Sequence, residues 1–392
     1  MSIQWNEWLQ ALESGEWSSE LLTGLDSSLP SVQIIELAQT HQPPARSHTP
    51  LFQLIPKSWF VPGRDSWFQL LEISEGLGEE PQAFYTLVAN LLDRNWSPWA
   101  RQVGGPLATA FFDADSEDPR LQWACSLDAE ELDTFEPDAF AATPHARHLT
   151  HLRVAIDFVE DTWRTLATNP SLSNLLQLSV TGGEEGAYLF PLQANLSSLE
   201  WLDLCSAEID DDKLTQLCEA EHLRNLRHLD LGMNPDWNPN QVENAGLLAL
   251  AESNVIQNLE YLDLSSNEDI GAEGIEALVN SPNAQHLKTL HLSWLYSFSD
   301  EAVEAIVHSD YLKNLEILTF QVTSHVNQVT LDALADTDNL PSLQILDLNS
   351  IMYKGQPNYF PEDTNDITPE AMEVFVQQMA ERGVEVRYQL QQ

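Results

Sequence analysis

Aromatic rings and aspartates recur together at nearly constant spacing in the second half of the chain. Each of the segments LEWLDL, LRHLDL and LEYLDL carries an aspartate two residues after a ring, which gives the pairs Trp201 and Asp203, His228 and Asp230, and Tyr261 and Asp263. Residues two apart on a β-strand point to the same face, and neighbouring strands lie about 4.8 Å apart. If these segments are neighbouring strands, they carry a column of carboxylates beside a column of rings.

A column of carboxylates favours a cationic ligand. Neighbouring carboxylates repel each other by about 1 kcal/mol in water, and by more when they are desolvated. Lys or Arg side chains of a protein partner would relieve this repulsion, and the rings would add apolar area and cation attraction. Two alternatives are aspartates that are simply solvated and a divalent-metal site made by Asp263 and His291 on adjacent strands. We expect a protein ligand, with no metal and no cofactor.

The three segments belong to a longer series of leucine-based repeats. LKTLHL, LEILTF and LQILDL follow them, and the first leucines of the six segments lie 27, 33, 28, 28 and 28 residues apart. Two weaker segments, LTHLRV from Leu149 and SNLLQL from Ser173, precede them and bring the total to about eight. A strand and a helix within 28 residues cannot bury both of their apolar faces alone, so neighbouring repeats must stack.

Two hydrophobic periods alternate within each repeat. In LEYLDL, Leu262 and Leu264 occupy every second position, as in a strand with one buried face. Residues 275–279 show helical spacing instead. Thr368 suits the N-cap of the last helix and Gly383 its C-terminal end. Further helices are predicted in 210–221, 299–309 and 368–383, and a final strand is predicted from Val384.

This pattern resembles the leucine-rich repeat family, in particular the strand-plus-helix subclass with 28-residue units that ribonuclease inhibitor typifies. The resemblance covers residues 149–392. It implies an α/β solenoid in which parallel strands line a concave face and helices cover the convex face, and it suggests a nuclease as one candidate partner. Family members usually place Asn or Cys three residues after the last strand leucine, and here Asn234 and Asn267 occupy that position.

Two columns of side chains are expected on the concave face. The first contains His151, Leu175, Trp201, His228, Tyr261, Thr289, Ile317 and Ile345, and the second contains Arg153, Gln177, Asp203, Asp230, Asp263, His291, Thr319 and Asp347. Long insertions after the strands would add aromatic residues at the rim. The predicted partner-binding set is Trp201, Asp203, His228, Asp230, Tyr261, Asp263, His291, Trp294, Trp237 and Tyr359.

Residues 1–145 lack the repeat and contain eight of the twelve tryptophans. Helical patterns separated by a proline-rich stretch predict a mainly helical domain. Because the apolar edge of the first repeat needs a cover, we assign residues 1–145 as a capping domain. Residues 146–392 form the repeat domain, with about eight repeats and a C-terminal strand cap. A separate binding task is the alternative for the first domain.

Charge and composition exclude several functions. The 392 residues include 17 Lys plus Arg and 61 Asp plus Glu, a net charge of −44 that opposes nucleic-acid binding. A hydrophobic content of 43% indicates a folded, soluble body. No stretch approaches about 18 apolar residues, so we expect neither a signal peptide nor a membrane span. Three scattered cysteines fit a reducing cytoplasm better than a disulfide framework.

Motifs that would indicate an enzyme are weak or absent. The sequence lacks phosphate-binding glycine loops and the G-x-S-x-G nucleophile motif. Asp113 and Asp115 begin a calcium-like loop, but Asp118 stands where that loop needs glycine. Cys205 is expected to be a packed or exposed thiol. Three histidines recur every third residue, but their segment leads into a strand that would separate them: His145, His148 and His151.

We therefore interpret the protein as a non-enzymatic, cytoplasmic scaffold or inhibitor that binds a basic protein through an acidic, aromatic concave face. The alternative is a structural subunit of a larger assembly whose acidity reflects a high-salt habitat, because only five of the 17 basic residues are Lys. An enzyme within the tryptophan-rich domain is a third reading, which no group of residues supports.

Overall fold

The computed structural model describes Trp67, Leu71, Trp99 and residues 101–132, 134–156, 158–181, 186–193, 195–232, 240–295, 297–320, 327–348 and 367–388. The chain divides into two compact units, Met1–Leu152 and Arg153–Gln392. Apart from Trp67 and Leu71, which are helical, the helices predicted before residue 100 lie outside the described residues, as do the insertions that carry Trp237 and Tyr359.

The leucine repeats fold into short strands that follow one another in chain order. They make one ten-stranded sheet of β1 (Ser126–Asp128), β2 (His151–Val154), β3 (Gln177–Val180), β4 (Trp201–Asp203), β5 (His228–Asp230), β6 (Tyr261–Asp263), β7 (Thr289–His291), β8 (Ile317–Thr319), β9 (Ile345–Asp347) and β10 (Glu385–Arg387). Every pair from β3 to β10 is parallel. The final strand predicted from Val384 is confirmed as β10.

Leucines fix the register of this sheet. The middle residues of β3 to β9 face each other across every strand pair and are at most 3% exposed: Leu178, Leu202, Leu229, Leu262, Leu290, Leu318 and Leu346. A one-residue slip of any strand would turn its leucine away from the core and its flanking polar residues into it. The flanking residues of each strand therefore point to the opposite face.

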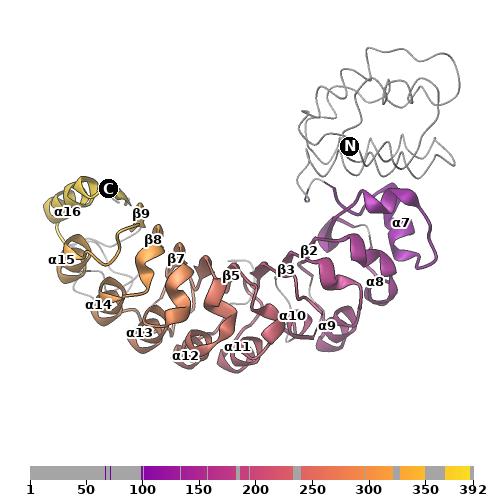
Figure 1. Cartoon of the computed structure of the whole chain (residues 1–392), viewed down its shortest axis with the longest axis horizontal. Helices are drawn as coiled ribbons and strands as arrows, with labels where there is room; N and C mark the ends of the chain where they lie inside the picture. Colours follow the sequence, from indigo (N-terminus) through magenta and orange to yellow (C-terminus); the bar gives the residue numbers. More distant parts are fainter. Residues whose placement is uncertain are drawn as a thin grey trace, which may run out of the picture. The chain divides into compact units, whose positions relative to one another are not determined.

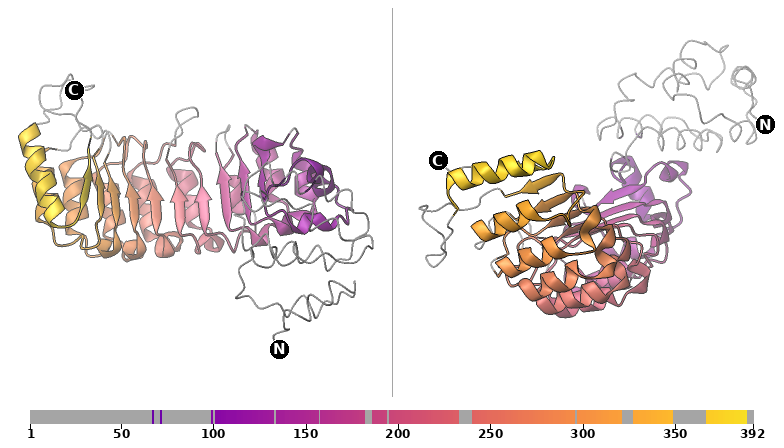
Figure 2. Two further views of the ribbon diagram at one scale, coloured as in Figure 1. Left: turned by 90° about the horizontal axis from the view of Figure 1, so that it is seen from above. Right: turned by 60° about the vertical axis from the view of Figure 1, so that its left-hand side comes forward.

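Helices return the chain from one strand to the next. In the second unit they are α9 (Glu160–Ala167), α10 (Leu189–Gln193), α11 (Asp211–Cys218), α12 (Asn244–Glu252), α13 (Ala272–Val279), α14 (Asp300–His308), α15 (Gln328–Asp336) and α16 (Pro369–Glu381). Within this unit the strands line the concave side and the helices the convex side (Figures 1 and 2). The α/β solenoid expected from the sequence is confirmed.

Local chemistry sets the ends of the last helix as predicted. The Thr368 hydroxyl accepts a hydrogen bond from the Ala371 backbone N–H at 3.2 Å, and Pro369 occupies the first turn, where its missing N–H costs nothing. Gly383 has a φ of 80°, a left-handed conformation that glycine adopts without strain. The sequence signals for this helix were sufficient because they are local.

The register predicted for the third strand was wrong. Gln177 pairs with Trp201, and Ser179 pairs with Asp203. Leu175, expected on the concave face, is fully buried at the end of a short 3-10 helix. The repeat therefore starts at Leu175, two residues later than SNLLQL suggested. Leu175 occupies the position that Leu199 occupies in the next repeat.

A buried asparagine ladder supports the concave sheet from behind. Asn267 is fully buried and donates hydrogen bonds to the carbonyls of Leu231 and Leu264, both at 2.9 Å, as its position predicted. Asn240, 3% exposed, does the same for the preceding repeat by donating to the Leu204 and Leu231 carbonyls at 2.9 and 3.0 Å. The longest repeat thus supplies a buried asparagine nine residues after the strand leucine, a spacing that the family pattern does not reveal. Asn234, at the position that the pattern indicates, lies outside the described residues.

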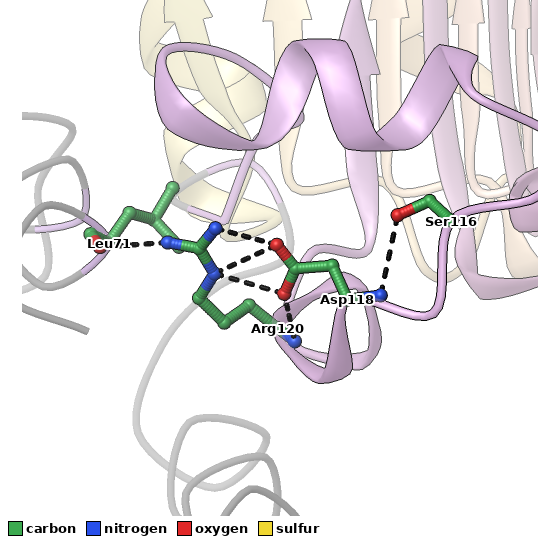
Figure 3. Close-up of polar contacts among 4 residues, drawn as sticks. All are labelled: Leu71, Ser116, Asp118 and Arg120. Carbon is green, nitrogen blue, oxygen red and sulfur yellow. Dashed lines mark hydrogen bonds and ion pairs between the residues drawn. The ribbon is translucent and has the colours of Figure 1, made fainter. Parts of the chain in front are cut away.

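The first unit contains α7 (Pro106–Phe112), a 3-10 turn (Pro119–Gln122) and α8 (Pro137–Ala142) among its described residues. Figure 3 shows Asp118 bound to the Arg120 guanidinium, whose Nη1 donates to the Leu71 carbonyl at 3.3 Å. Burial opposes ionisation of Asp118, but the hydrogen bonds and charge of Arg120 outweigh it and lower the pKa of this carboxyl. Asp118 therefore forms an ion pair with Arg120, in agreement with an acidic surface loop at this point.

Candidate functional site

The candidate site lies on the concave face of β4, β5 and β6. Asp203 faces Asp230, and Asp230 faces Asp263, so the aspartate column predicted from the sequence is present. The side chains are half-buried, because rings and hydroxyls flank them on the same face. We refer to Asp203, Asp230 and Asp263 as the aspartate column.

Each of these carboxylates is held by the turn that follows its strand. One oxygen of Asp203, Asp230 and Asp263 accepts the backbone N–H two residues ahead, at 2.9, 2.8 and 2.8 Å respectively. Such local bonds fix the side-chain rotamers, which keeps the three acids aligned.

The second carboxylate oxygens differ from each other. Ser179 donates to Asp203 Oδ2 at 2.8 Å, and the Tyr261 hydroxyl reaches Asp263 Oδ2 at 3.4 Å. Within the described chain, no donor reaches Oδ2 of Asp230. The central acid therefore has an open acceptor position between two other carboxylates.

Burial and like charge make this central acid reluctant to ionise. Burial first, and then the charges of Asp263 and Asp203, raise the pKa of Asp230 to about 7. Burial also raises the pKa of Asp203, although its hydrogen bonds and the positive charge of Arg153 oppose the shift. A cation in this position would restore the charged form of Asp230.

The rings beside the acids form a stack. Trp201 and His228 lie 4.6 Å apart between ring centroids at 25°, and His228 and Tyr261 lie 3.9 Å apart at 8°. Both faces of the His228 ring are therefore covered, which excludes cation–π binding over this ring. Burial, with a contribution from His291, lowers the pKa of His228 to about 4, so it is neutral at pH 7. The stack supplies apolar area, and the carboxylates supply the attraction for a cation.

The remaining described site residues extend the face toward β7. His291 pairs with Asp263 in the sheet and contacts Thr319 Oγ1 through Nδ1 at 2.9 Å. Its ring lies edge-on to that of Tyr261, with 5.2 Å between the ring centroids. Trp294 follows β7 and is 44% exposed with a φ of 60°. A bulky residue in the left-handed region is strained.

The repeats explain how Trp294 reaches its conformation. Ser206 and Ser266 stand at the same position, two residues after the last strand leucine, with φ values of 55° and 67°. The left-handed turn is thus a property of the repeat, and the tryptophan is the exceptional residue placed on it. Trp237 and Tyr359, predicted beside this face, fall outside the described residues.

Metal-ligand chemistry is limited in this face. Asp203, Cys205 and Asp230 each bring one ligand atom within 4.8 Å of the others, and they are the only such group in the described residues. Burial, Asp230 and Asp203 raise the pKa of the Cys205 thiol to about 12. The thiol is protonated at neutral pH and is a poor nucleophile. Asp263 and His291, the pair considered for a metal from the sequence, are neighbours without a third ligand in the described chain.

The three regularly spaced histidines serve other purposes. His145 and His148 lie in a 3-10 turn (Pro144–His148) rather than in the strand, and His151 begins β2. His145 Nε2 contacts the Asp113 carbonyl at 3.1 Å, and His151 Nδ1 contacts Thr150 Oγ1 at 2.8 Å. The metal group found above does not include them.

Comparison with known proteins gives one matching family and several solved structures. The model of a family described as a leucine-rich repeat region matches residues 145–385. No curated protein matches the sequence. Among helices of the described segments, none has the length and apolarity to cross a membrane.

Solved structures resemble the chain at low identity. An internalin (inlF) from Listeria monocytogenes is 15% identical over 68% of this chain and 70% of that one, with a TM-score of 0.37. The yeast Rad7 and Elc1 complex contains a chain that is 14% identical over 92% of this chain and 98% of that one, with a TM-score of 0.43. A chain of the mouse RP105/MD-1 complex is 20% identical over 64% of this chain and 44% of that one, with a TM-score of 0.37.

Proposed function

The chain belongs to the leucine-rich repeat family, and from this premise we propose that it is a non-enzymatic scaffold or inhibitor that binds a basic protein on its concave face. Stacked repeats create extended concave surfaces that suit protein ligands. The ribonuclease-inhibitor-like subclass, and a nuclease as the partner, stay predictions.

One observation carries the proposal, which is the aspartate column with its unfilled oxygen. Three carboxylates at strand spacing repel each other, and burial increases this cost. Asp230 has a raised pKa and an oxygen without a donor in the described chain. A Lys or Arg side chain at this position would donate a charge-assisted hydrogen bond and remove the repulsion.

The stack and the exposed tryptophan define how the rest of the partner would be received. Trp201, His228 and Tyr261 offer apolar area beside the acids, and Trp294 presents an exposed ring at the rim, as binding hot spots do. Trp237 and Tyr359 remain proposed contacts in the insertions. Residues 1–145 remain a proposed capping domain.

The alternative of acidity as adaptation to a high-salt habitat is less well supported at this site. Acids that serve hydration belong on exposed surface, whereas Asp203 and Asp230 are half-buried and their pKa values are raised by burial. The fixed alignment of the three acids instead favours a bound cation.

The test compares two triple variants that remove the same charge. Asp203→Asn, Asp230→Asn and Asp263→Asn together should reduce affinity for the captured partner by about a hundredfold, since charge pairs that are desolvated on binding are worth several kcal/mol. Asp212→Asn, Glu273→Gln and Glu304→Gln change exposed acids on the convex helices and serve as the control.

Capture from native lysate followed by mass spectrometry supplies the partner, and calorimetry at low and high salt supplies the affinities. We expect basic proteins whose binding weakens with salt and with the concave variant only. Recovery of neutral or acidic proteins with equal affinity for both variants would contradict the proposal.

A further inference from the structure

A second recess lies away from the aspartate column, where the chain enters its strands. It has a volume of about 740 Å³ and runs from Leu176, just before β3, to Asn314, just before β8. At about 4.8 Å between strands, five steps make it about 24 Å long. We call this recess the rim groove. Its length and repeated polar lining suit an elongated ligand.

The charges within the rim groove cancel each other. Glu260 accepts hydrogen bonds from Arg227 Nε at 2.9 Å and from Lys288 Nζ at 2.5 Å, so both of its oxygens are used. The hydrogen bond from Lys288, together with the charge of Arg227, lowers the pKa of Glu260 despite partial burial. A charged ligand would have to compete with these ion pairs, whereas a neutral ligand would not.

A ladder of amides runs beside these charges. The Nδ2 atoms of Asn225, Asn258 and Asn314 donate to carbonyls of the preceding repeat at 2.9, 3.1 and 2.8 Å. Each bond orients its side chain and leaves the Oδ1 acceptor and one N–H for a ligand, as no further bond of these three amides occurs in the described chain. Such groups are positioned before a ligand arrives, which lowers the entropic cost of binding.

We propose that the rim groove binds a neutral, extended, β-linked oligosaccharide. Hydroxyl groups both donate and accept, so they match a surface that combines amide groups, carboxylate acceptors and cationic donors. Sugar rings joined through opposite oxygens advance about 5 Å per unit, given single bonds of about 1.5 Å. This advance follows the strand spacing of about 4.8 Å, so successive sugars meet polar side chains at the same position of successive repeats.

Two other ligand classes fit the groove less well. An extended peptide places side chains of one face about 6.8 Å apart, which falls out of step with the strands. An anion would be repelled by a chain with a net charge of −44. A cation would be drawn to the unneutralised aspartate column instead of the balanced rim groove.

The experiment titrates the full chain with neutral β-1,4-linked hexasaccharides of glucose, mannose and xylose, by calorimetry and by ligand-observed NMR. We expect at least one to bind at a single site, with little dependence on salt. The double variant Asn225→Ala and Asn258→Ala should lower that affinity by at least about tenfold. The variant Asn283→Ala is the matched control, because its amide also bridges repeats, to the Ser253 carbonyl at 3.1 Å, but lies outside the groove.

Each outcome decides for or against the inference. The triple asparagine variant of the aspartate column should bind the sugar normally, so loss of partner binding and loss of sugar binding can be told apart. Failure of all three hexasaccharides to bind would overturn the proposal. So would equal affinity of the wild type and the double variant, or binding of a neutral Ser- and Asn-rich peptide in place of the sugars.

Discussion

Two lines of charged side chains cross the same strands and are built in opposite ways. On the rim, Glu200, Arg227, Glu260 and Lys288 alternate in sign, and Glu260 bridges both cations. On the concave face the aspartate column repeats one sign at the same spacing.

This difference shows that the high net negative charge of the chain does not by itself explain why three acids stand side by side in the aspartate column. The same repeats that balance charge on the rim leave it unbalanced a few residues further along each strand. The rim pairs are partly exposed, and such pairs are worth less than about 1 kcal/mol each. The acids are more buried, so their imbalance has the larger energetic consequence, which the proposed basic ligand would relieve.

The largest expected effect is a loss of stability when a buried asparagine behind the concave sheet is replaced, compared with an exposed asparagine of the rim groove. Asn240→Ala should lower the free energy of unfolding by about 2 to 4 kcal/mol, because it strands buried carbonyls of two repeats and the Ile209 N–H that bonds Oδ1 at 2.8 Å. Asn225→Ala should cost less than about 1 kcal/mol, since water can replace its bond. Urea denaturation measures both, and equal losses would break the contrast.

The second effect is the loss of folding stability that ionisation of Asp230 causes. Its folded pKa of about 7 lies above the unfolded value of about 4, so its protonated form stabilises the fold at low pH and this stability is lost as pH rises toward and through 7. Asp230→Asn keeps the shape and should therefore raise the free energy of unfolding at pH 8 by about 1 to 2 kcal/mol, a value reduced for partial solvation. The gain should vanish near pH 4. A loss of stability at pH 8 would show that Asp230 is already neutralised.

Partner affinity should follow the same ionisation. Because a cation requires charged Asp230, binding should strengthen as pH rises through about 7. One unit below that pKa about one acid in ten is charged, so affinity should fall by about tenfold between pH 8 and pH 6. Calorimetry across this range tests the slope, with Asp230→Asn as the variant that should show none. A flat profile for the wild type would separate Asp230 from binding.

The smallest effect belongs to the rim. Glu260→Gln removes one anion that bridges Arg227 and Lys288, and should lower the free energy of unfolding by less than about 1 kcal/mol. Its destabilisation should shrink further at high salt, and affinity for the basic partner should not change. A loss above about 2 kcal/mol would mean that the rim charges are structurally as important as the concave acids.

Much of the repeat domain could be predicted because its determinants are local and periodic. Leu262 and Leu264 are buried as the alternation required, and the cap at Thr368 acts as expected. The third strand was misplaced because SNLLQL offers adjacent leucines, and only the neighbouring strand decides which of them faces the core. Asn240 was missed because an insertion moved it away from the usual position.

The site was predicted in outline and not in its energetics. Strand alternation was enough to place Asp203, Asp230 and Asp263 side by side. The contrast between Asp230 and its neighbours depends on Ser179, which reaches Asp203 from the preceding strand, and on the orientation of the Tyr261 hydroxyl toward Asp263 within the same strand. The stacking of His228 between two rings also depends on side-chain angles that spacing does not encode.

The unbroken leucine row has a mechanical corollary. Among the described residues of 153–392, each strand pairs only with its neighbours in chain order, so tension applied at the C-terminal end should peel the solenoid rather than shear it as a block. A force–extension curve would then show successive peaks, each of which releases about 28 residues, or roughly 95 Å of contour length. Such a chain behaves as a stepwise spring.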